Sequence, residues 1–280
     1  MTNNSNIPAI RFKGFSDAWE QRKLGEVAEF NPKSELPEEF EYVDLESVVG
    51  TEMIAHRTEL KRTAPSRAQR LAKTGDVFYQ TVRPYQRNNL IFHNSNKDIP
   101  SVASTGYAQL RSNTPSFLFQ TINSDYFCEQ VLSKCTGTNY PAINSEDLGT
   151  IMIAYPKNKT EQGKIAEILM KWDEMVELQD QYLKKLEIRK KAVMKKLLTP
   201  KADWKDFSIF ELGELYQPIT ISNNQLQENG YKVYGANGLI GFYDKYNHEN
   251  SEIAITCRGS TCGNVILTEP KSWITGNAMV

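Results

Sequence analysis

The segment from Arg83 to Asn89 combines side chains that can read the edges of nucleic-acid bases. It follows an apolar run typical of a strand and holds two guanidinium groups, three carboxamides and one aromatic ring. Arginine can donate two hydrogen bonds to guanine, asparagine or glutamine can bind adenine, and all three can hold phosphate. The segment therefore predicts a DNA-contacting loop, and a polar turn between two strands is the alternative. The candidate contacts are Arg83, Tyr85, Gln86, Arg87 and Asn88.

A second segment, from Ser133 to Tyr140, offers small hydroxyl side chains and a glycine. Such residues allow backbone amides to approach a phosphate closely. An ordinary turn before Pro141 explains the same composition. The candidate contacts in this segment are Lys134, Thr138, Asn139 and Tyr140.

Charge is sorted along the chain, although the formal net charge is only -1. Residues 17–52 hold eleven acidic and three basic side chains, whereas residues 57–87 hold eight basic and two acidic ones. The balanced total argues against a chain that binds nucleic acid over its whole surface. The local basic excess favours DNA contact near the first loop, and a solvated face that balances the acidic stretch is the alternative.

The sequence lacks the patterns of a catalytic or metal site. It has neither a Gly-rich phosphate loop nor a dinucleotide-binding motif, and its three histidines are scattered. Cys257 and Cys262 lack the second pair that a zinc site needs. Glu59-Leu60-Lys61 and Glu269-Pro270-Lys271 mimic the tail of a metal-dependent nuclease motif, but chance explains such tripeptides in a charged chain. We expect no catalytic residues, no metal site and no cofactor.

Length and composition indicate a folded protein of one or two domains. The chain has 280 residues, of which 40% are hydrophobic and 24% charged. No apolar run reaches the roughly 18 residues that a membrane span needs. The polar N-terminus does not resemble a signal peptide. Four irregularly spaced cysteines suit a reducing compartment, so we expect a cytoplasmic protein without membrane contact.

Residues 158–200 predict one long helix that would position these loops. Apolar residues recur there in alternating steps of three and four, interrupted by Gln179 and Lys190, which is the seam of a coiled coil. Asn158 is expected to cap the helix, with the Glu161 side chain reaching back to its amide, and Pro200 ends it. The exposed seam predicts a partner helix. The seam residues are Ile165, Leu169, Trp172, Val176, Leu183, Leu186, Val193 and Leu197.

The segments on either side of this helix resemble each other in three places and in the same order, which predicts an internal repeat. The segment from Asp76 to Pro84 is echoed by that from Glu252 to Gly259, and Thr105-Gly106-Tyr107-Ala108 by Thr275-Gly276-Asn277-Ala278. Arg258, in the second of these segments, is a further candidate DNA contact. The matched segments also include a Trp19 to Val27 motif and its counterpart after Trp204.

Periodicity predicts a mixed α+β protein. In the first copy we expect a helix or turn at 24–30, strands near 42–49, 76–83, 89–93, 104–111 and 149–155, and a helix at 116–134. In the second copy we expect strands at 231–235, 239–243, 252–257, 263–267 and 273–280, and this copy is expected to be partial. The predicted domains are 1–157, the spacer helix 158–200 and 201–280.

The run from Thr136 to Asn144 and the helix opening from Glu161 to Leu169 resemble the end of a target-recognition domain in the specificity (S) subunit of type I restriction-modification enzymes. Trp172-Asp173, the helix end at Lys195 to Leu198 and the opening around Trp19 are similar to the same family. The resemblance covers essentially the whole chain. It implies a twisted mixed or antiparallel sheet with helices, followed by a coiled-coil spacer helix and a partial second copy.

The resemblance also implies partners and a division of labour. Such a subunit binds double-stranded DNA at a bipartite site and docks methyltransferase (M) subunits, and through them the restriction (R) subunit, while the chemistry belongs to those subunits. Since the second copy lacks the second long helix of that family, either the chain is a truncated or rearranged product or two copies pair their spacer helices antiparallel, and we expect such pairing. The alternatives are a coiled-coil adaptor without sequence-specific DNA binding and a stand-alone nuclease using Glu59 and Lys61.

Overall fold

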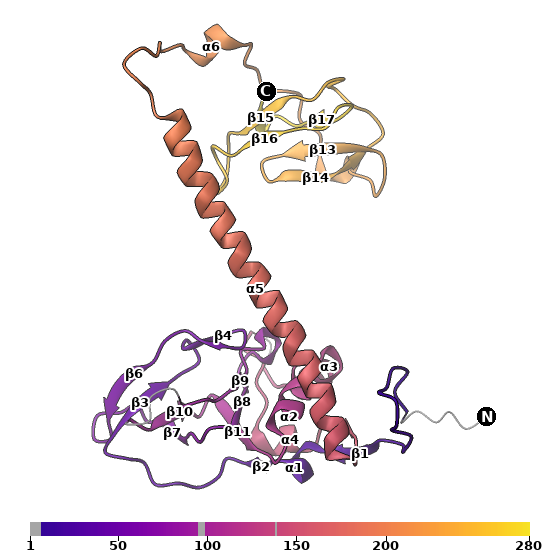
Figure 1. The fold of residues 1–280 in the computed structure, drawn as a ribbon. Coiled ribbons are helices and arrows are strands. Elements are labelled where there is room, and N and C mark those ends of the chain that lie inside the picture. The colour runs from indigo at the N-terminus through magenta and orange to yellow at the C-terminus, as the bar shows by residue number, and fades with distance from the viewer. Residues whose placement is uncertain (1–6, 95–98, 138) are drawn as a thin grey trace, which may run out of the picture. The chain divides into compact units, whose positions relative to one another are not determined.

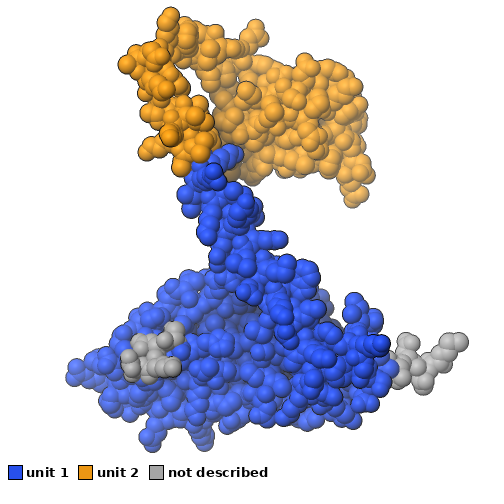
Figure 2. Space-filling model, viewed as in Figure 1, with its two compact units in different colours: residues 1–191 blue, residues 192–280 orange. Residues whose placement is uncertain are grey.

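The computed structural model describes residues 7–94, 99–137 and 139–280, in two compact units. Residues 1–191 form the first unit and residues 192–280 the second (Figure 2). The chain is α+β, as predicted, with several small sheets and one long helix (Figure 1). The three-part division at 157 and 200 stays a prediction.

Two four-stranded sheets form the centre of the first unit. One has the order β6-β3-β10-β7, in which β10 runs parallel to β3 and the other pairs are antiparallel. The other has the order β2-β11-β8-β9 and is antiparallel throughout. The strands are β2 (Glu29–Phe30), β3 (Glu39–Val43), β6 (Arg57–Leu60), β7 (Ala68–Leu71), β8 (Val77–Gln80), β9 (Leu90–Ile91), β10 (Ser101–Ser104) and β11 (Tyr107–Arg111).

The main core lies where helices cover the second sheet. Alternate residues of β8 and β11, among them Tyr79 and Leu110, pack against Leu118 and Phe127 of the helices α2 and α3. A strand can present one face to a core in this way because its side chains alternate with period two. The other elements of the unit are β1 (Glu20–Lys23), α1 (Leu24–Val27), β4 (Val48–Val49), β5 (Glu52–Met53), α2 (Pro115–Ile122), α3 (Asp125–Lys134), α4 (Ser145–Gly149) and β12 (Met152–Tyr155).

The predicted long helix is α5 (Lys159–Leu198), an unbroken run of 40 residues. At about 1.5 Å per residue, it is about 60 Å long. Asn158 caps it, because its Oδ1 accepts a hydrogen bond from the Thr160 amide at 2.8 Å. The predicted return of Glu161 to the Asn158 amide is wrong. Glu161 instead accepts two hydrogen bonds from Arg11, at 2.7 and 2.9 Å, because burial beside that arginine gives its carboxylate a charged partner.

The second unit repeats the strand order of the first. Its sheet β14-β13-β17 matches β6-β3-β10, with one antiparallel and one parallel pair, and its antiparallel sheet β16-β15-β18 matches β9-β8-β11. This topology agrees with the internal repeat that the sequence predicts. The elements are α6 (Ile209–Leu212), β13 (Tyr231–Gly235), β14 (Gly238–Tyr243), β15 (Ile253–Thr256), β16 (Val265–Leu267), β17 (Trp273–Ile274) and β18 (Ala278–Met279).

Several predicted elements are shorter than expected because a turn interrupts them. The helix at 116–134 is two helices, since Ser124 caps α3 through a hydrogen bond from the Phe127 amide. The strand at 104–111 is broken at Gly106, where an added Cβ would lie 2.9 Å from Leu45. The strands at 42–49 and 273–280 are likewise each divided in two. The predicted helix or turn at 24–30 is the short helix α1 followed by the strand β2, and the strands β1, β5, β6 and β7 were also not predicted.

Candidate nucleic-acid interface

The first candidate loop is held in a strained backbone shape. Arg83 and Arg87 lie at the two ends of the short 3-10 helix η1 (Pro84–Gln86), with φ values of 54° and 53°. For a residue with a Cβ atom, this left-handed conformation costs about 1–2 kcal/mol. Such a conformation persists only where surrounding contacts impose it, and it is often found at functional sites. The loop therefore has one defined shape.

The buried side chain of Gln80, at the end of β8, supplies contacts that impose this shape. Its Nε2 atom donates to the Val82 carbonyl at 2.7 Å and to Gln86 Oε1 at 2.9 Å, and its Oε1 atom accepts from the Asn88 amide at 3.2 Å. One carboxamide thus joins the beginning, the middle and the end of the loop.

Asn89 closes the loop from the other side and is also buried. Its Oδ1 atom accepts from the Gln80 amide at 2.9 Å, and its Nδ2 atom donates to Asn123 Oδ1 at 2.8 Å. The two buried amides thus fasten the loop through hydrogen bonds within the protein.

The structure brings the two candidate loops together. Isolated bridges pair Ala142 with both Val82 and Thr136, and the Arg83 amide donates to the Pro141 carbonyl at 2.7 Å. The Arg83 guanidinium lies over the Tyr140 ring, 4.3 Å from its centroid. Segments more than fifty residues apart in sequence therefore form one surface.

The aromatic groups of this surface point to solvent. Tyr85 and Tyr140 are 50% and 63% exposed, so neither ring is packed within the core. Gln86 and Asn139 are exposed as well. Exposed rings, amides and a stacked guanidinium can bind bases by stacking and hydrogen bonding and can hold phosphate.

Some of the predicted contacts are engaged within the fold. Arg87 donates to Asp125 at 2.6 Å, and this hydrogen bond raises the pKa of its guanidinium. Asn88 Oδ1 accepts from the Gly50 amide at 2.9 Å, so it fixes a neighbouring turn. Lys134 donates to Thr150 Oγ1 at 2.7 Å. Thr138 lies outside the described residues.

The basic segment 57–87 divides into paired and unpaired groups. Three of these groups form ion pairs with carboxylates, namely Arg57, Lys61 and Arg87. For these three, the alternative of a solvated face that balances the acidic stretch fits. Within the described part of the chain, the other five basic side chains form no ion pair. These are Arg62, Arg67, Arg70, Lys73 and Arg83.

Arg258 occupies the corresponding loop of the second unit. It is exposed and follows β15 as Arg83 follows β8. Thr261 fastens this loop, because its hydroxyl donates to the Ala236 carbonyl at 2.7 Å. The second unit thus also places an arginine after its central strand.

The predicted seam of α5 is largely exposed. Ile165 is half-buried, while the exposed fractions of Leu169 to Leu197 along the seam range from 40% to 66%. The first turns are buried against the globular part at Glu161, Gln162 and Ala166, and further along the helix Asp173 accepts a hydrogen bond from Gln120 at 2.7 Å. Most of the seam is an apolar stripe that the globular part of the first unit leaves exposed.

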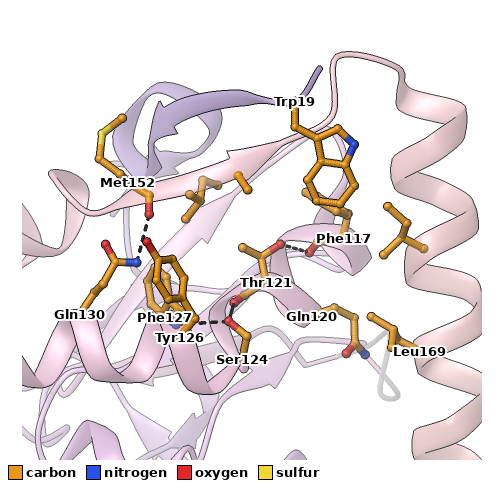
Figure 3. A pocket seen from close by; sticks show the side chains of 13 residues that line it. Trp19, Phe117, Gln120, Thr121, Ser124, Tyr126, Phe127, Gln130, Met152 and Leu169 are labelled. Atoms are coloured by element: carbon orange, nitrogen blue, oxygen red, sulfur yellow. Dashed lines mark hydrogen bonds between the residues drawn. The ribbon is translucent and has the colours of Figure 1, made fainter. Parts of the chain in front are cut away.

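An apolar hollow opens beside the root of α5 (Figure 3). Its volume is about 200 Å³, and its lining includes Trp19, Phe117, Phe127 and the seam residues Ile165 and Leu169. No charged side chain lines it, so it is unsuited to phosphate. It continues the apolar seam onto the globular part of the first unit.

Metal-dependent chemistry would need several ligand side chains close together. No group of three histidine, cysteine, aspartate or glutamate side chains is placed to hold a metal ion in residues 7–94, 99–137 and 139–280. Glu59 accepts a hydrogen bond from Arg57, and Lys61 pairs with Glu38. No helix of the described chain is sufficiently long and apolar to span a membrane.

Sequence reasoning missed the role of Gln80 and understated that of Asn89. The signal for Gln80 was a carboxamide that ends the otherwise apolar strand Val77-Phe78-Tyr79, where its burial demands hydrogen-bond partners. Its partners could not be named from the sequence because they depend on the path of the loop.

Comparisons with known proteins agree on one family. The model of the type I restriction modification DNA specificity domain matches residues 16–188. The specificity subunit of the type I restriction enzyme HindI from Haemophilus influenzae is 22% identical over 190 residues, which is 63% of this chain and 40% of that protein. The match therefore spans less than half of that relative.

Solved structures share the fold. A chain from a type I restriction-modification system, determined in a study of complex assembly and conformational transition, has a TM-score of 0.57 at 20% identity, and the match covers 97% of this chain and 76% of that one. The HsdS subunit from Thermoanaerobacter tengcongensis has a TM-score of 0.51 at 22% identity, with coverages of 98% and 76%. The S subunit from M. genitalium has a TM-score of 0.56 at 18% identity, with coverages of 97% and 74%.

Proposed function

The chain belongs to the family of type I restriction-modification DNA specificity domains, and from this premise we propose that it directs methyltransferase and restriction subunits to a bipartite DNA site. The observation that carries the proposal is the convergence of the two candidate loops, with Arg83 stacked on the exposed Tyr140. A strained loop that is fixed before binding loses little conformational entropy when it meets a ligand.

Arg83 and Gln86 are the proposed base-reading groups. Arg83 forms no ion pair within the described residues, so its donors can turn to guanine or phosphate. Gln86 is exposed, and although its Oε1 atom accepts a hydrogen bond from Gln80, its Nε2 atom can donate to N7 of adenine. Arg87, Asn88 and Lys134 fit a supporting role, because their partners lie within the protein. Tyr85 and Tyr140 supply exposed rings that can contact sugar, phosphate or base.

The second unit supports a two-part site. It repeats the strand order of the first unit and places Arg258 after β15. We propose that this loop contacts the second half-site, and that α5 separates the two readers. A helix of about 60 Å exceeds the ~34 Å of one DNA turn.

The proposed role is recognition without catalysis by this chain. The exposed seam of α5 and the apolar hollow at its root are the proposed docking surface for methyltransferase subunits, which in turn bring the restriction subunit. Contiguous exposed apolar surface is typical of protein interfaces.

Self-association through α5 is the second proposed use of the seam. Residues 159–178 carry three basic and five acidic side chains, and residues 179–198 carry seven basic and two acidic ones. Two antiparallel copies would place unlike charges together, whereas parallel copies would place the basic halves together. The charge distribution therefore favours an antiparallel pair.

Adenine-methylation mapping of DNA from cells that express the chain with its methyltransferase tests the function. We expect a split methylated motif that is absent without the chain. A chain that acts only as an adaptor would yield no motif, and the purified complex would show no preference among duplexes at any salt concentration.

A further inference from the structure

Arg70, in the edge strand β7, has a guanidinium group that pairs with no carboxylate of the described residues. Its Nε atom is fully buried and forms no hydrogen bond. Neither of its two Nη atoms is both fully buried and without a partner. Burial lowers the pKa of the guanidinium, and no carboxylate in the described chain opposes that effect. One edge of the guanidinium group is therefore buried in the protein, and the other edge is less buried.

This arrangement is unfavourable for the protein alone. A charge that is removed from water is destabilising unless a partner compensates it, and arginine cannot shed its proton to escape the cost. Two other arginines of this unit with restricted exposure are compensated by carboxylates, and the half-buried Arg83 has the Tyr140 ring as its partner. Arg11 pairs with Glu161, and Arg111 pairs with the buried Asp76 at 2.8 Å. No carboxylate of the described residues pairs with Arg70 in this way, so a bound anion would compensate its charge.

The position of β7 indicates which anion this is. The Arg67 carbonyl, just before β7, accepts from the Thr105 amide at 2.8 Å, and the Gly106 carbonyl accepts from the Thr81 amide at 2.9 Å. Thr81 precedes the Arg83 loop by two residues. The beginning of β7 and the beginning of the candidate reading loop therefore meet at the turn between β10 and β11.

A row of unpaired cations leads from this turn along β7. Arg67 is exposed and lies at the turn. Arg70 follows it in the chain, and the three intervening steps of an extended strand span about 10 Å. Neither forms an ion pair in the described part of the chain. A duplex bound at the reading loop carries a phosphate for every ~1.7 Å of its axis and supplies anions over this distance.

We propose that Arg70 holds a backbone phosphate of the bound DNA, in a site distinct from the loops that read bases. The proposal rests on the proposed DNA-binding function. The half-buried position strengthens the interaction, because the charge acts in a medium of lower dielectric. Since phosphates are present in every sequence, Arg70 contributes affinity without specificity.

Substitution of Arg70 separates this role from a structural one. Arg70→Met in the full chain, with its methyltransferase partners, should bind every duplex about 10-fold more weakly and reduce the slope of log affinity against log salt by about 1. Its resistance to urea should be equal to or greater than that of the wild type, because a buried, unpaired charge has been removed. Arg70→Lys should retain most of the salt slope. Arg22→Met removes the same charge from an arginine that already pairs with Glu20 and Glu26, and it should leave DNA binding unchanged.

Several results would overturn the inference. An unchanged salt slope in Arg70→Met, with normal DNA binding by the wild type, would refute the phosphate contact and leave the proposed DNA-binding function standing. Lower stability of Arg70→Met would assign the side chain a structural role instead. Stabilisation of the wild type by inorganic phosphate, lost in Arg70→Met without any change in DNA affinity, would assign a free anion. Failure of the wild type to bind any duplex would refute the proposed function itself.

Discussion

The substitution Gln80→Leu tests whether buried contacts, and not only exposed groups, determine DNA affinity. Gln80 is almost completely buried and presents no surface to a ligand. Leucine has a similar volume and fits an apolar site, but it cannot make the three side-chain hydrogen bonds that connect β8 to the loop.

The expected magnitude follows from those contacts. Each hydrogen bond contributes about 1 kcal/mol net, so their loss removes about 3 kcal/mol that holds the loop. The loop shape requires left-handed backbone conformations at Arg83 and Arg87, which are unfavourable. Each of them costs about 1–2 kcal/mol. Without Gln80 the loop should leave this shape for most of the time. If the bound conformation becomes about 2 kcal/mol less favourable, the apparent affinity falls about 30-fold.

Binding to a methylation-mapped target duplex is the appropriate assay, with urea unfolding measured in parallel. Gln109→Leu is the matched control, because Gln109 is also fully buried and donates to the Leu71 carbonyl and to Asp76. Both variants should lose stability, but only Gln80→Leu should lose affinity under conditions where both remain folded. Equal affinities for the two variants would refute the reasoning.

Three further predictions concern the surface, the helix root and the seam. Arg83→Ala should weaken binding by about 1–3 kcal/mol, at one half-site if Arg83 reads a base and for all sequences alike if it holds phosphate. A double-mutant cycle with Tyr140→Leu should give a coupling of about 0.5 kcal/mol or more, and strict additivity would contradict the stacking. The hydrogen bond from Arg11 lowers the pKa of Glu161. This pair should therefore stabilise the fold fully above pH ~4.3 and lose its effect as the pH falls through the lower folded value. Glu161→Gln should flatten that part of the urea-stability profile, and an unchanged profile would contradict the assignment. Leu186→Asp should shift a concentration-dependent dimer to monomer in analytical ultracentrifugation, and a wild-type chain that is monomeric at all concentrations would contradict seam pairing.

The sequence determined the features that depend on local periodicity. The helix Lys159–Leu198 could be predicted almost to the residue, because its hydrogen bonds join residues four apart and its cap lies beside it in sequence. The internal repeat and the two candidate loops were also visible, since residue type and order suffice to find them.

Only the tertiary structure decided what each candidate side chain does. Arg83 and Arg87 belong to the same short motif, yet one stacks on Tyr140 and the other pairs with Asp125. Glu161 satisfies a capping pattern but binds Arg11, which lies 150 residues away in sequence. Local sequence patterns predict hydrogen bonds between residues that are close in the chain. A buried polar group instead bonds to whichever partner the folded chain places beside it, and the sequence alone does not specify that partner.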